Sequence, residues 1–407
     1  MPERHFADTD QIATRCTIQD LTPQLSRPDP GLLIIDAMSS PPPALLWDVF
    51  CRVIDNFGDI GVCWRLAADL ASRGQRVRLW VDDPSALRWM APEGRAGVEV
   101  ATWSGSTAFP PPGDVVVEAF GCDPAPGFLA AMAGNSETGR APAWINLEYL
   151  SAEDYVERSH RLASPQMSGP ARGLVKWFFY PGFTAATGGL LREPGLLAEQ
   201  AAFDRAAWLA THGLALGADE RLVTVFCYPG APLDRLVASL AADGRPTVIA
   251  SAPGAATGAL RAALATRVDV PSTLRQHALP WLPQPDFDRL LWASDLNFVR
   301  GEDSWVRAHW AGRPFVWQAY PQDDGAHGAK IAAFLDRALA DASPDAAEAI
   351  RVWTAAWNGL DDPSTPLPSW TPALLASAGE SLRAWRARLL AMDDLAARLF
   401  ALALEKR

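Results

Sequence analysis

The sequence predicts an α/β protein built from two doubly wound domains that face each other across a cleft. The chain has 407 residues, which is too long for one ordinary hydrophobic core. Apolar runs of strand length alternate with segments of helical periodicity, a pattern typical of parallel sheets covered on both faces. The alternation occurs as two separate series, one from residue 44 and one from about residue 220, so two such domains are expected.

The first series begins with the run LLWDVFCRV, residues 45–53, which has the length and apolar content of a buried strand. A helix is predicted over residues 60–73, because Ile60, Trp64 and Ala67 recur on one face. Further strands are predicted at 76–81, 114–120 and 143–148.

The second series repeats this order of elements. Strands are predicted at 221–228, 246–251, 296–300 and 314–320, and helices at 232–241, 287–294, 304–312 and 328–340. The helix at 304–312 reaches Gly312, and glycine commonly terminates helices. The tail, residues 371–407, is rich in alanine, leucine and arginine and is predicted to be helical.

These elements divide the chain into four parts. Residues 1–43 are polar, broken by prolines and end in SSPPPA, which predicts a disordered leader with Met38 as an alternative start. We expect one Rossmann-like domain at 44–190 and a second at 191–375. We expect residues 376–407 to form helices that pack back toward the first domain.

Composition excludes several classes of protein. The net charge is -11 and no basic block occurs, which argues against a nucleic-acid partner. The apolar runs are too short to span a bilayer, so no membrane association is expected. The five cysteines are scattered without a CxxC motif, which predicts neither a disulfide framework nor a zinc site and favours a cytoplasmic location.

Two carboxylates, Asp55 and Asp59, follow the first predicted strand in the stretch VIDNFGDIG. Ligands of open α/β sheets bind at the carboxyl ends of strands. Asp59 could instead cap a helix that begins at Ile60, and Asp55 could form a turn. A cap needs only one acid, however, and the chain lacks the GxGxxG loop of dinucleotide-binding proteins. Two carboxylates at this place suit a cationic ligand or a general base.

A second candidate is the stretch FVRGEDSWVRAHWAG, in which a strand ends and a helix begins. The N-terminus of a helix and the guanidinium of Arg300 favour an anion, and Gly301 permits close approach to the backbone. Glu302 can accept hydrogen bonds from sugar hydroxyls. The alternative is that Asp303 or Ser304 caps the helix while Arg300 pairs with Glu302.

The third candidate, LVKWFFYPGF, holds five aromatic residues in seven positions. It can be a core strand, or a loop that presents aromatic side chains to a partner, because Pro181 and Gly182 break it. Tyr228, Gln284 and Phe287 lie near strand ends or before a helix in the second series, where they could line a nucleotide pocket. The histidines show no ligand spacing, so no metal is predicted.

The motifs DVFCRVIDNFGDIGVCWRLAADLA, KWFFYPGF and RGEDSWVRAHWAGRPFVWQAYPQ closely resemble the EarP family, bacterial protein-arginine rhamnosyltransferases that modify translation elongation factor P. The resemblance runs from about residue 45 into the C-terminal helices. It implies a GT-B glycosyltransferase fold, with residues 44–190 on the acceptor side and residues 191–375 binding the donor nucleotide. It also implies dTDP-β-L-rhamnose as donor, one arginine of elongation factor P as acceptor, and inversion at the anomeric carbon. Arg300 and the helix that starts at Ser304 would neutralise charge on the diphosphate, so no metal or other cofactor is expected. The modification would activate elongation factor P for the translation of polyproline stretches.

The resemblance also implies roles for particular residues. The essential acids map to Asp55, Asp59 and Glu302, with Asp59 expected as the base and Asp55 as the group that orients the acceptor. The implied donor-binding residues are Asn56, Phe57, Gly58, Tyr228, Gln284, Phe287, Arg300, Gly301, Asp303 and Ser304. The expected contacts to the acceptor protein are Lys176, Phe178, Phe179, Tyr180 and Phe183.

Two other functions remain open. A GT-B transferase with another acceptor would not need the aromatic loop, and a non-catalytic sugar-nucleotide-binding module would not need both aspartates. An NAD-dependent oxidoreductase is disfavoured because the glycine fingerprint is missing.

Overall fold

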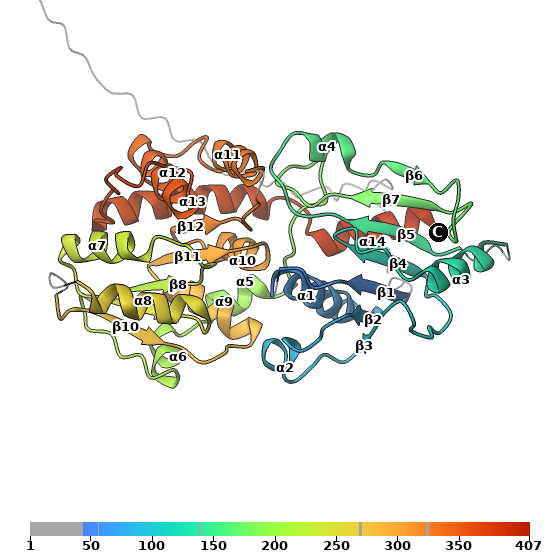
Figure 1. Ribbon diagram of the computed structural model, residues 1–407, viewed down its shortest axis with the longest axis horizontal. Helices are drawn as coiled ribbons and strands as arrows, with labels where there is room; N and C mark the ends of the chain where they lie inside the picture. Colours follow the sequence, from blue (N-terminus) through green and yellow to red (C-terminus); the bar gives the residue numbers. More distant parts are fainter. Residues whose placement is uncertain (1–43, 56, 138, 140, 268–270, 323–324) are drawn as a thin grey trace, which may run out of the picture. The chain divides into compact units, whose positions relative to one another are not determined.

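The computed structural model describes residues 44–407 except 56, 138, 140, 268–270 and 323–324. The leader predicted at residues 1–43, with the alternative start at Met38, lies outside the described residues. Within them, two sheets form two α/β halves, each with its own core (Figure 1). No helix in this part of the chain is long and apolar enough to cross a membrane.

The first half is built on a sheet with the strand order β3-β2-β1-β4-β5-β7-β6. Its strands are β1 (Leu46–Cys51), β2 (Arg76–Val81), β3 (Val98–Thr102), β4 (Val115–Ala119), β5 (Ala143–Leu147), β6 (Ala163–Pro165) and β7 (Val175–Phe179). Neighbouring strands are parallel except β6, which runs antiparallel to β7 at the edge. Every residue of β4 and β5 is buried, as the continuous apolar runs predict for a sheet covered on both faces.

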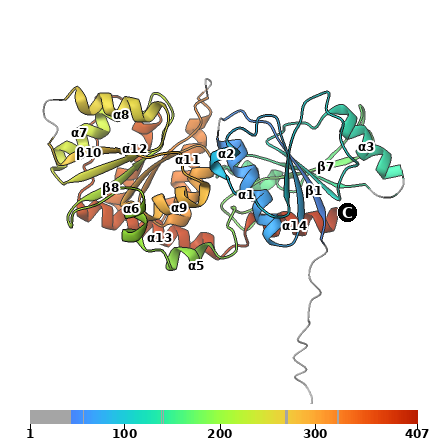
Figure 2. The same cartoon turned by 90° about the horizontal axis from the view of Figure 1, so that it is seen from below.

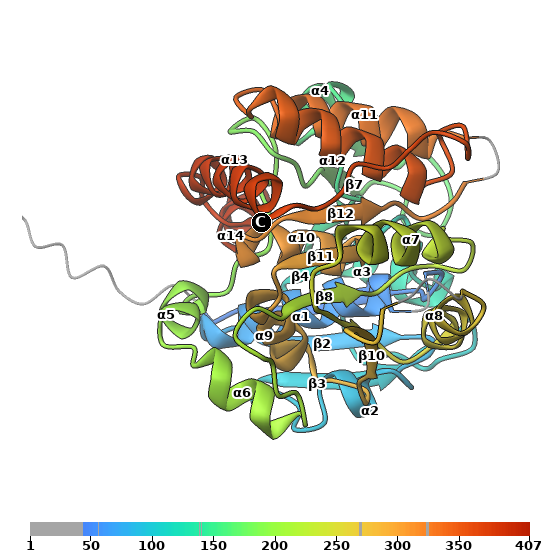
Figure 3. The same cartoon turned by 90° about the vertical axis from the view of Figure 1, so that its left-hand side faces the viewer.

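The second half is built on a smaller sheet in which all the pairs are parallel, with the strand order β10-β9-β8-β11-β12. Its strands are β8 (Arg221–Val225), β9 (Thr247–Ser251), β10 (Leu274–Ala278), β11 (Leu296–Arg300) and β12 (Phe315–Gln318). Helices lie on both faces of this sheet (Figure 3). They are α5 (Leu196–Ala201), α6 (Arg205–Thr211), α7 (Leu233–Asp243), α8 (Ala255–Ala265), α9 (Gln284–Ala293), α10 (Asp303–Ala311), α11 (His327–Ala338), α12 (Pro344–Trp357) and α13 (Pro372–Leu390).

The helices of the first half are α1 (Gly58–Ser72), α2 (Leu87–Met90), α3 (Pro126–Glu137), α4 (Tyr155–Ser159) and α14 (Leu395–Lys406). We expected residues 376–407 to pack as one block toward the first half. Helix α13 instead packs on the second core through Leu375, Leu382 and Leu389, and α14 packs on the first core (Figure 2). The chain therefore returns to the first half only after α13.

Several element limits differ from those that the sequence predicted, and the differences matter for the site. The first strand ends at Cys51 and the first strand of the second half ends at Val225, each a few residues earlier than expected. Helix α1 begins at Gly58 rather than at Ile60. The shorter strands leave loops at their carboxyl ends, and these loops carry the candidate site residues.

Candidate active site

The candidate residues come from the carboxyl ends of strands in both halves. Asp55 lies in the loop between β1 and α1, and Asp59 lies in the first turn of α1. Arg300 ends β11, and Glu302 directly precedes α10. The phenol of Tyr228 donates a hydrogen bond of 2.5 Å to the carboxylate of Asp55, which joins the loops of the two halves.

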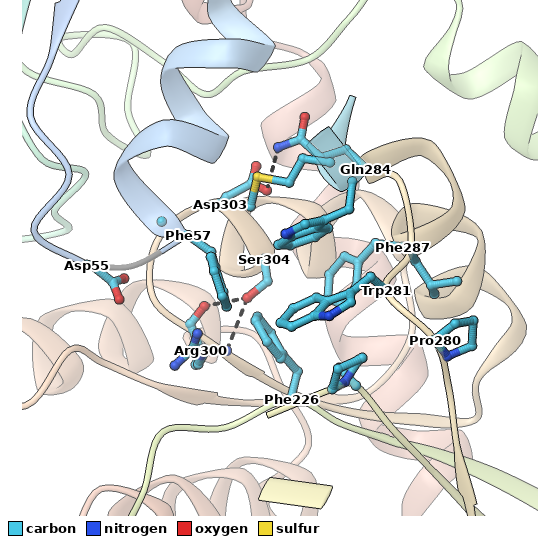
Figure 4. A pocket seen from close by; sticks show the side chains of 16 residues that line it. Asp55, Phe57, Phe226, Pro280, Trp281, Gln284, Phe287, Arg300, Asp303 and Ser304 are labelled. Atoms are coloured by element: carbon cyan, nitrogen blue, oxygen red, sulfur yellow. Dashed lines mark hydrogen bonds between the residues drawn. The ribbon is translucent and has the colours of Figure 1, made fainter. Parts of the chain in front are cut away.

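An open cavity, here called the aromatic cavity, lies beside this junction. Its rings belong to Phe57, Trp89, Phe226, Trp281 and Phe287. Figure 4 shows Phe57, Phe226 and Trp281 around one space, with Arg300 at its edge. Aromatic faces bind the face of a flat ring such as a nucleobase.

Arg300 provides the positive charge of this cavity. Its guanidinium lies 4.3 Å from the centre of the Tyr228 ring and 4.5 Å from that of Phe226. In the described part of the chain no carboxylate forms a salt bridge with Arg300, so the expected alternative of a pair with Glu302 is wrong. The Ser304 hydroxyl donates to the carbonyl of Arg300 and accepts from its N–H, which fixes the turn before α10. A cation beside a helix N-terminus is a suitable site for a diphosphate.

Asp59 is only 2% exposed, and its carboxylate holds the loop that precedes α1. One oxygen, Oδ2, accepts the backbone N–H groups of Ile54 at 2.8 Å and Asp55 at 2.9 Å. The helix has no side-chain cap, because its N-cap residue is Phe57. The alternative that Asp59 merely caps the helix is therefore wrong. The second oxygen, Oδ1, accepts a long hydrogen bond of 3.3 Å from Tyr149, and both residues line a second cavity.

The second cavity is larger than the aromatic cavity and is here called the acidic cavity. Its polar lining includes Asp55, Asp59, Glu153, Glu302, Tyr149, Tyr155, Tyr320 and Lys330. Asp55 lines both cavities and therefore stands where they meet. Such a set of carboxylates and phenols can hold a cationic group by charge-assisted hydrogen bonds.

Burial raises the pKa of all three candidate acids. For Asp59, the N–H groups of Asp55 and Ile54 oppose the effect of burial on the pKa, and for Asp55 the hydrogen bond from Tyr228 does so. For Glu302, burial raises the pKa to about 7, and the nearby charge of Lys330 counteracts part of the rise. Its Oε2 accepts the N–H of Leu150 at 3.0 Å. A carboxylate with a raised pKa is a stronger base.

Comparison with known proteins identifies the family of this chain. Residues 47–403 match the model of the family described as Elongation-Factor P (EF-P) rhamnosyltransferase EarP. The chain belongs to this family. The family and the two-domain fold predicted from the sequence are both confirmed.

Relatives of established activity support the assignment. The Pseudomonas aeruginosa protein-arginine rhamnosyltransferase is 42% identical over 332 residues, which cover 77% of this chain and 86% of the relative. The enzyme of the same name from Pseudomonas putida is 41% identical over 375 residues, which cover 87% of this chain and 97% of the relative. A solved chain from work on the structural basis for EarP-mediated arginine glycosylation of translation elongation factor EF-P is 29% identical, with a TM-score of 0.61 and coverage of 89% of this chain and 100% of that chain. The chain is thus an enzyme of the EarP rhamnosyltransferase family, with a GT-B fold.

The structure brings most of the donor-binding residues that the EarP resemblance implies to one place. The aromatic cavity is lined by Phe57, Gly58, Gln284, Phe287, Arg300, Asp303 and Ser304. Tyr228 lies against Arg300, and Gly301 lines the acidic cavity. Asn56 lies outside the described residues. A position in the lining of a cavity does not establish ligand binding, so the donor-binding roles of these residues remain predictions.

The side chains of two of the implied donor-binding residues form hydrogen bonds with α1. Asp303 Oδ1 accepts from Nε of Arg65 at 2.6 Å, and Gln284 Nε2 donates to the carbonyl of Gly61 at 3.1 Å. Helix α10 has no side-chain cap, which contradicts the alternative that Asp303 or Ser304 caps it.

The residues expected to contact the acceptor protein do not form one exposed surface. Phe179 is 1% exposed and Phe183 is 6% exposed, so the expectation of a partner contact is wrong for these two. Phe179 ends β7 and packs in the first core, and Phe183 packs in the second core. The half-buried Lys176 forms a salt bridge of 2.5 Å with Glu118.

Phe178 and Tyr180 remain partly exposed. Tyr180 lies against Tyr155 of the acidic cavity, with ring centres 5.8 Å apart.

Sequence reasoning missed several residues that line the two cavities. Trp89 and Trp281 come from different halves, and their ring centres lie 4.4 Å apart over the aromatic cavity. Phe226 directly follows β8, and Tyr149 lies shortly after β5. The rule that ligands bind at the carboxyl ends of strands, which selected Asp55, could therefore have selected both residues. Lys330 lies in α11 and carried no signal in the sequence.

Proposed function

We propose that this enzyme transfers L-rhamnose from dTDP-β-L-rhamnose to one arginine side chain of translation elongation factor P, with inversion of the anomeric centre. The observation that carries the proposal is that an aromatic cavity and an acidic cavity meet at Asp55. The description of the family and the related solved structure, both of which name elongation factor P, support this acceptor. Because translation takes place in the cytoplasm, we propose that the enzyme works there.

The aromatic cavity suits the donor. A thymine ring can lie among the aromatic faces, of which the resemblance implies Phe57 and Phe287 as donor-binding residues. The diphosphate would then reach Arg300 and the N-terminus of α10. The sugar would then lie toward Asp55, at the border of the acidic cavity.

The acidic cavity suits the acceptor. A guanidinium is permanently charged and presents its N–H groups as a planar fork. Asp55 and Glu302 can accept these N–H groups and so aim one nitrogen at the anomeric carbon. Asp59 lines the same cavity; the backbone holds its Oδ2, while its Oδ1 accepts only the long hydrogen bond from Tyr149 among the described residues.

In the proposed reaction the guanidinium nitrogen attacks the anomeric carbon as the bond from that carbon to the diphosphate oxygen breaks. The electron pair of the broken bond goes to the diphosphate, whose developing charge Arg300 stabilises. The nitrogen loses one proton to Asp59 Oδ1 in the same step. Proton transfer must accompany attack, because the pKa of a free guanidinium, near ~13, lies far above that of a carboxylate.

Intact-mass measurement tests the proposal. Elongation factor P incubated with the enzyme and dTDP-β-L-rhamnose should gain the mass of one deoxyhexose, and replacement of the acceptor arginine by lysine should abolish the gain. Modification of another acceptor but not of elongation factor P would favour a transferase of different specificity. A protein that binds dTDP but transfers no sugar would be a binding module.

A chelator should leave the activity unchanged. Arg300 and the N-terminus of α10 supply positive potential at the proposed diphosphate site, and a cation held by Asp55 and Asp59 would repel the guanidinium acceptor. We therefore expect the same initial rate in excess EDTA as in its absence, and no increase with added magnesium or manganese. Loss of activity in EDTA that magnesium restores would instead make the two aspartates metal ligands.

Glu302 should give the reaction a pH dependence. Burial raises its pKa to about 7, and only the ionised form can accept N–H groups of the guanidinium from both oxygens. We expect kcat/KM for the acceptor to fall as the pH drops through about 7, in a profile measured from about pH 5.5 to about pH 9. Glu302→Gln should lower activity and remove this inflection, whereas Glu153→Gln, on the same cavity, should keep it. If the inflection in the pH profile persists in Glu302→Gln, a group other than Glu302 causes it.

The same pKa shift predicts the effect of Glu302→Gln on stability. The pKa of Glu302 in the folded protein is raised above its ordinary value, so folding favours the protonated form. The contribution of Glu302 to stability is therefore lost as the pH rises through about 7. Above that pH, Glu302→Gln should melt at a temperature no lower than the wild type, which separates its loss of activity from misfolding.

A further inference from the structure

The contact between α1 and the second half is centred on a buried arginine. Arg65 is 5% exposed and lies in the second turn of α1. Its Nε donates to Asp303 Oδ1 at 2.6 Å, and its two Nη atoms donate to Asp288 at 2.9 and 3.1 Å. Nη1 also reaches Glu193 at 3.4 Å. None of these three acids belongs to the sheet or helices of the first half.

A second arginine binds two of the same acids. Arg307 of α10 contacts Glu193 at 2.6 Å and Asp288 at 2.7 and 3.0 Å. We call Arg65, Glu193, Asp288, Asp303 and Arg307 the Arg65 cluster. Although burial acts in the opposite direction, the charges of Arg307 and Arg65 lower the pKa of Glu193 to about 2, so this acid is ionised at neutral pH. Buried charges are tolerated when each has such partners, and here the partners of Arg65 lie across the junction of the two halves.

Gly61 allows the two halves to approach closely at the same place. The Gln284 amide donates to the Gly61 carbonyl at 3.1 Å. A Cβ atom at Gly61 would lie 3.2 Å from both Gln284 Nε2 and Asp303 Oδ2. Glycine is otherwise unfavourable inside a helix, so the close contact gives a physical reason for its presence.

The proposed reacting groups of both halves lie close in sequence to this contact. Asp59 lies less than two turns before Arg65 on α1, and Glu302 directly precedes Asp303. Asp55 approaches the backbone of the second half so closely that a Cβ atom at Gly301 would lie 2.8 Å from its Oδ2. The position of α1 against α10 therefore sets the distance between the aspartates and Glu302.

We propose that Arg65 is a positioning residue for glycosyl transfer: with Gly61 it holds α1 against α9 and α10, so that Asp55 and Asp59 of one half face Glu302 and Arg300 of the other. This deepens the proposed function and rests on it for the acceptor. Arg65 itself touches neither substrate in this arrangement. Small displacements of reacting groups cost large factors in rate, so the role should be visible in kcat.

Two variants and a matched control test the proposal. Arg65→Gln removes the charge from the Arg65 cluster, and Gly61→Ala adds a Cβ atom in the tight contact. Arg73→Gln is the control, because Arg73 also lies on α1 and pairs with Asp69 at 2.8 Å and Asp394 at 2.8 Å, both within the first half. We expect kcat to fall about 10- to 100-fold in both test variants and to stay within about twofold in the control, with KM changing less than kcat.

Stability and shape distinguish positioning from simple loss of folding. Gly61→Ala should melt close to the wild type, because the gain in helix propensity opposes the cost of displacing Gln284 and Asp303, and yet it should be slower. Small-angle X-ray scattering should show a larger radius of gyration for Arg65→Gln than for the control.

Equal kcat losses in Arg65→Gln and Arg73→Gln, or a fully active Gly61→Ala, would overturn the proposal. Failure of the wild type to modify elongation factor P would rule out the proposed acceptor, while the scattering comparison of Arg65→Gln with Arg73→Gln would still decide whether Arg65 holds the halves together.

Discussion

Asp59→Asn should lower turnover by roughly 100- to 10,000-fold, the usual contribution of a general base. The amide keeps the shape of the side chain and retains one oxygen. That oxygen can still accept the N–H groups of Ile54 and Asp55, which Asp59 Oδ2 accepts in the native protein. The NH₂ group then faces the acidic cavity, where it cannot take a proton from the acceptor.

The measurement is kcat at saturating donor and elongation factor P, accompanied by the melting temperature and the affinity for dTDP. Both of the latter should stay close to the wild-type values, because the loop remains anchored and the aromatic cavity is unchanged. Asp59→Ala serves as the comparison, since it removes the anchor of the loop as well as the base. Near-normal turnover by Asp59→Asn together with an inactive Asp59→Ala would restrict Asp59 to holding the loop.

The fold and part of the site could be predicted because they depend on local patterns. Buried strands such as β4 and β5 consist of continuous apolar residues, and each series of strands and helices is visible in the chain order. The rule that ligands bind at strand ends is sufficient to select Asp55, Asp59 and Glu302 as candidates from the sequence. Whether these acids act together depends on how the two halves meet, which no local pattern contains.

The contacts that assemble the site join residues far apart in the chain. Tyr228 and Asp55 are 173 positions apart, and Arg65 and Asp303 are 238 positions apart. A buried arginine on the apolar face of α1 has no distinctive sequence pattern, because its partners lie in other elements. The Arg65 cluster and the division of the site into two cavities could therefore only be found in the structure.

The aromatic stretch around Phe179 and Phe183 shows a different limit of pattern reading. A run of rings broken by Pro181 and Gly182 fits both a core strand and an exposed loop. In the structure β7 ends at Phe179, and the chain then turns so that Phe183 enters the second core. The break in the pattern marks a crossing between two cores, and of the aromatic residues expected to contact a partner, Phe178 and Tyr180 stay partly exposed.

Arg300→Ala should weaken the binding of dTDP by about 10- to 100-fold and lower the transfer rate as well. Each charge-assisted hydrogen bond to phosphate contributes about 1.5–3 kcal/mol, so the loss of one bond is sufficient for this change. Arg300 is free for this role because its guanidinium rests on Tyr228 and Phe226 rather than in a salt bridge with a described carboxylate. Isothermal titration calorimetry with dTDP measures the effect directly.

The matched control for this prediction is Arg52→Ala. Arg52 follows β1 and its guanidinium also lies over an aromatic ring, 5.4 Å from the centre of Trp103, but it lines neither cavity. Its removal should leave the affinity for dTDP unchanged. Arg300→Lys should fall between Arg300→Ala and the wild type, because lysine keeps the charge without the fork that matches two phosphate oxygens. If Arg300→Ala bound dTDP as tightly as Arg52→Ala, the diphosphate would have to lie elsewhere, and Arg300 would act only by holding Tyr228 against Asp55.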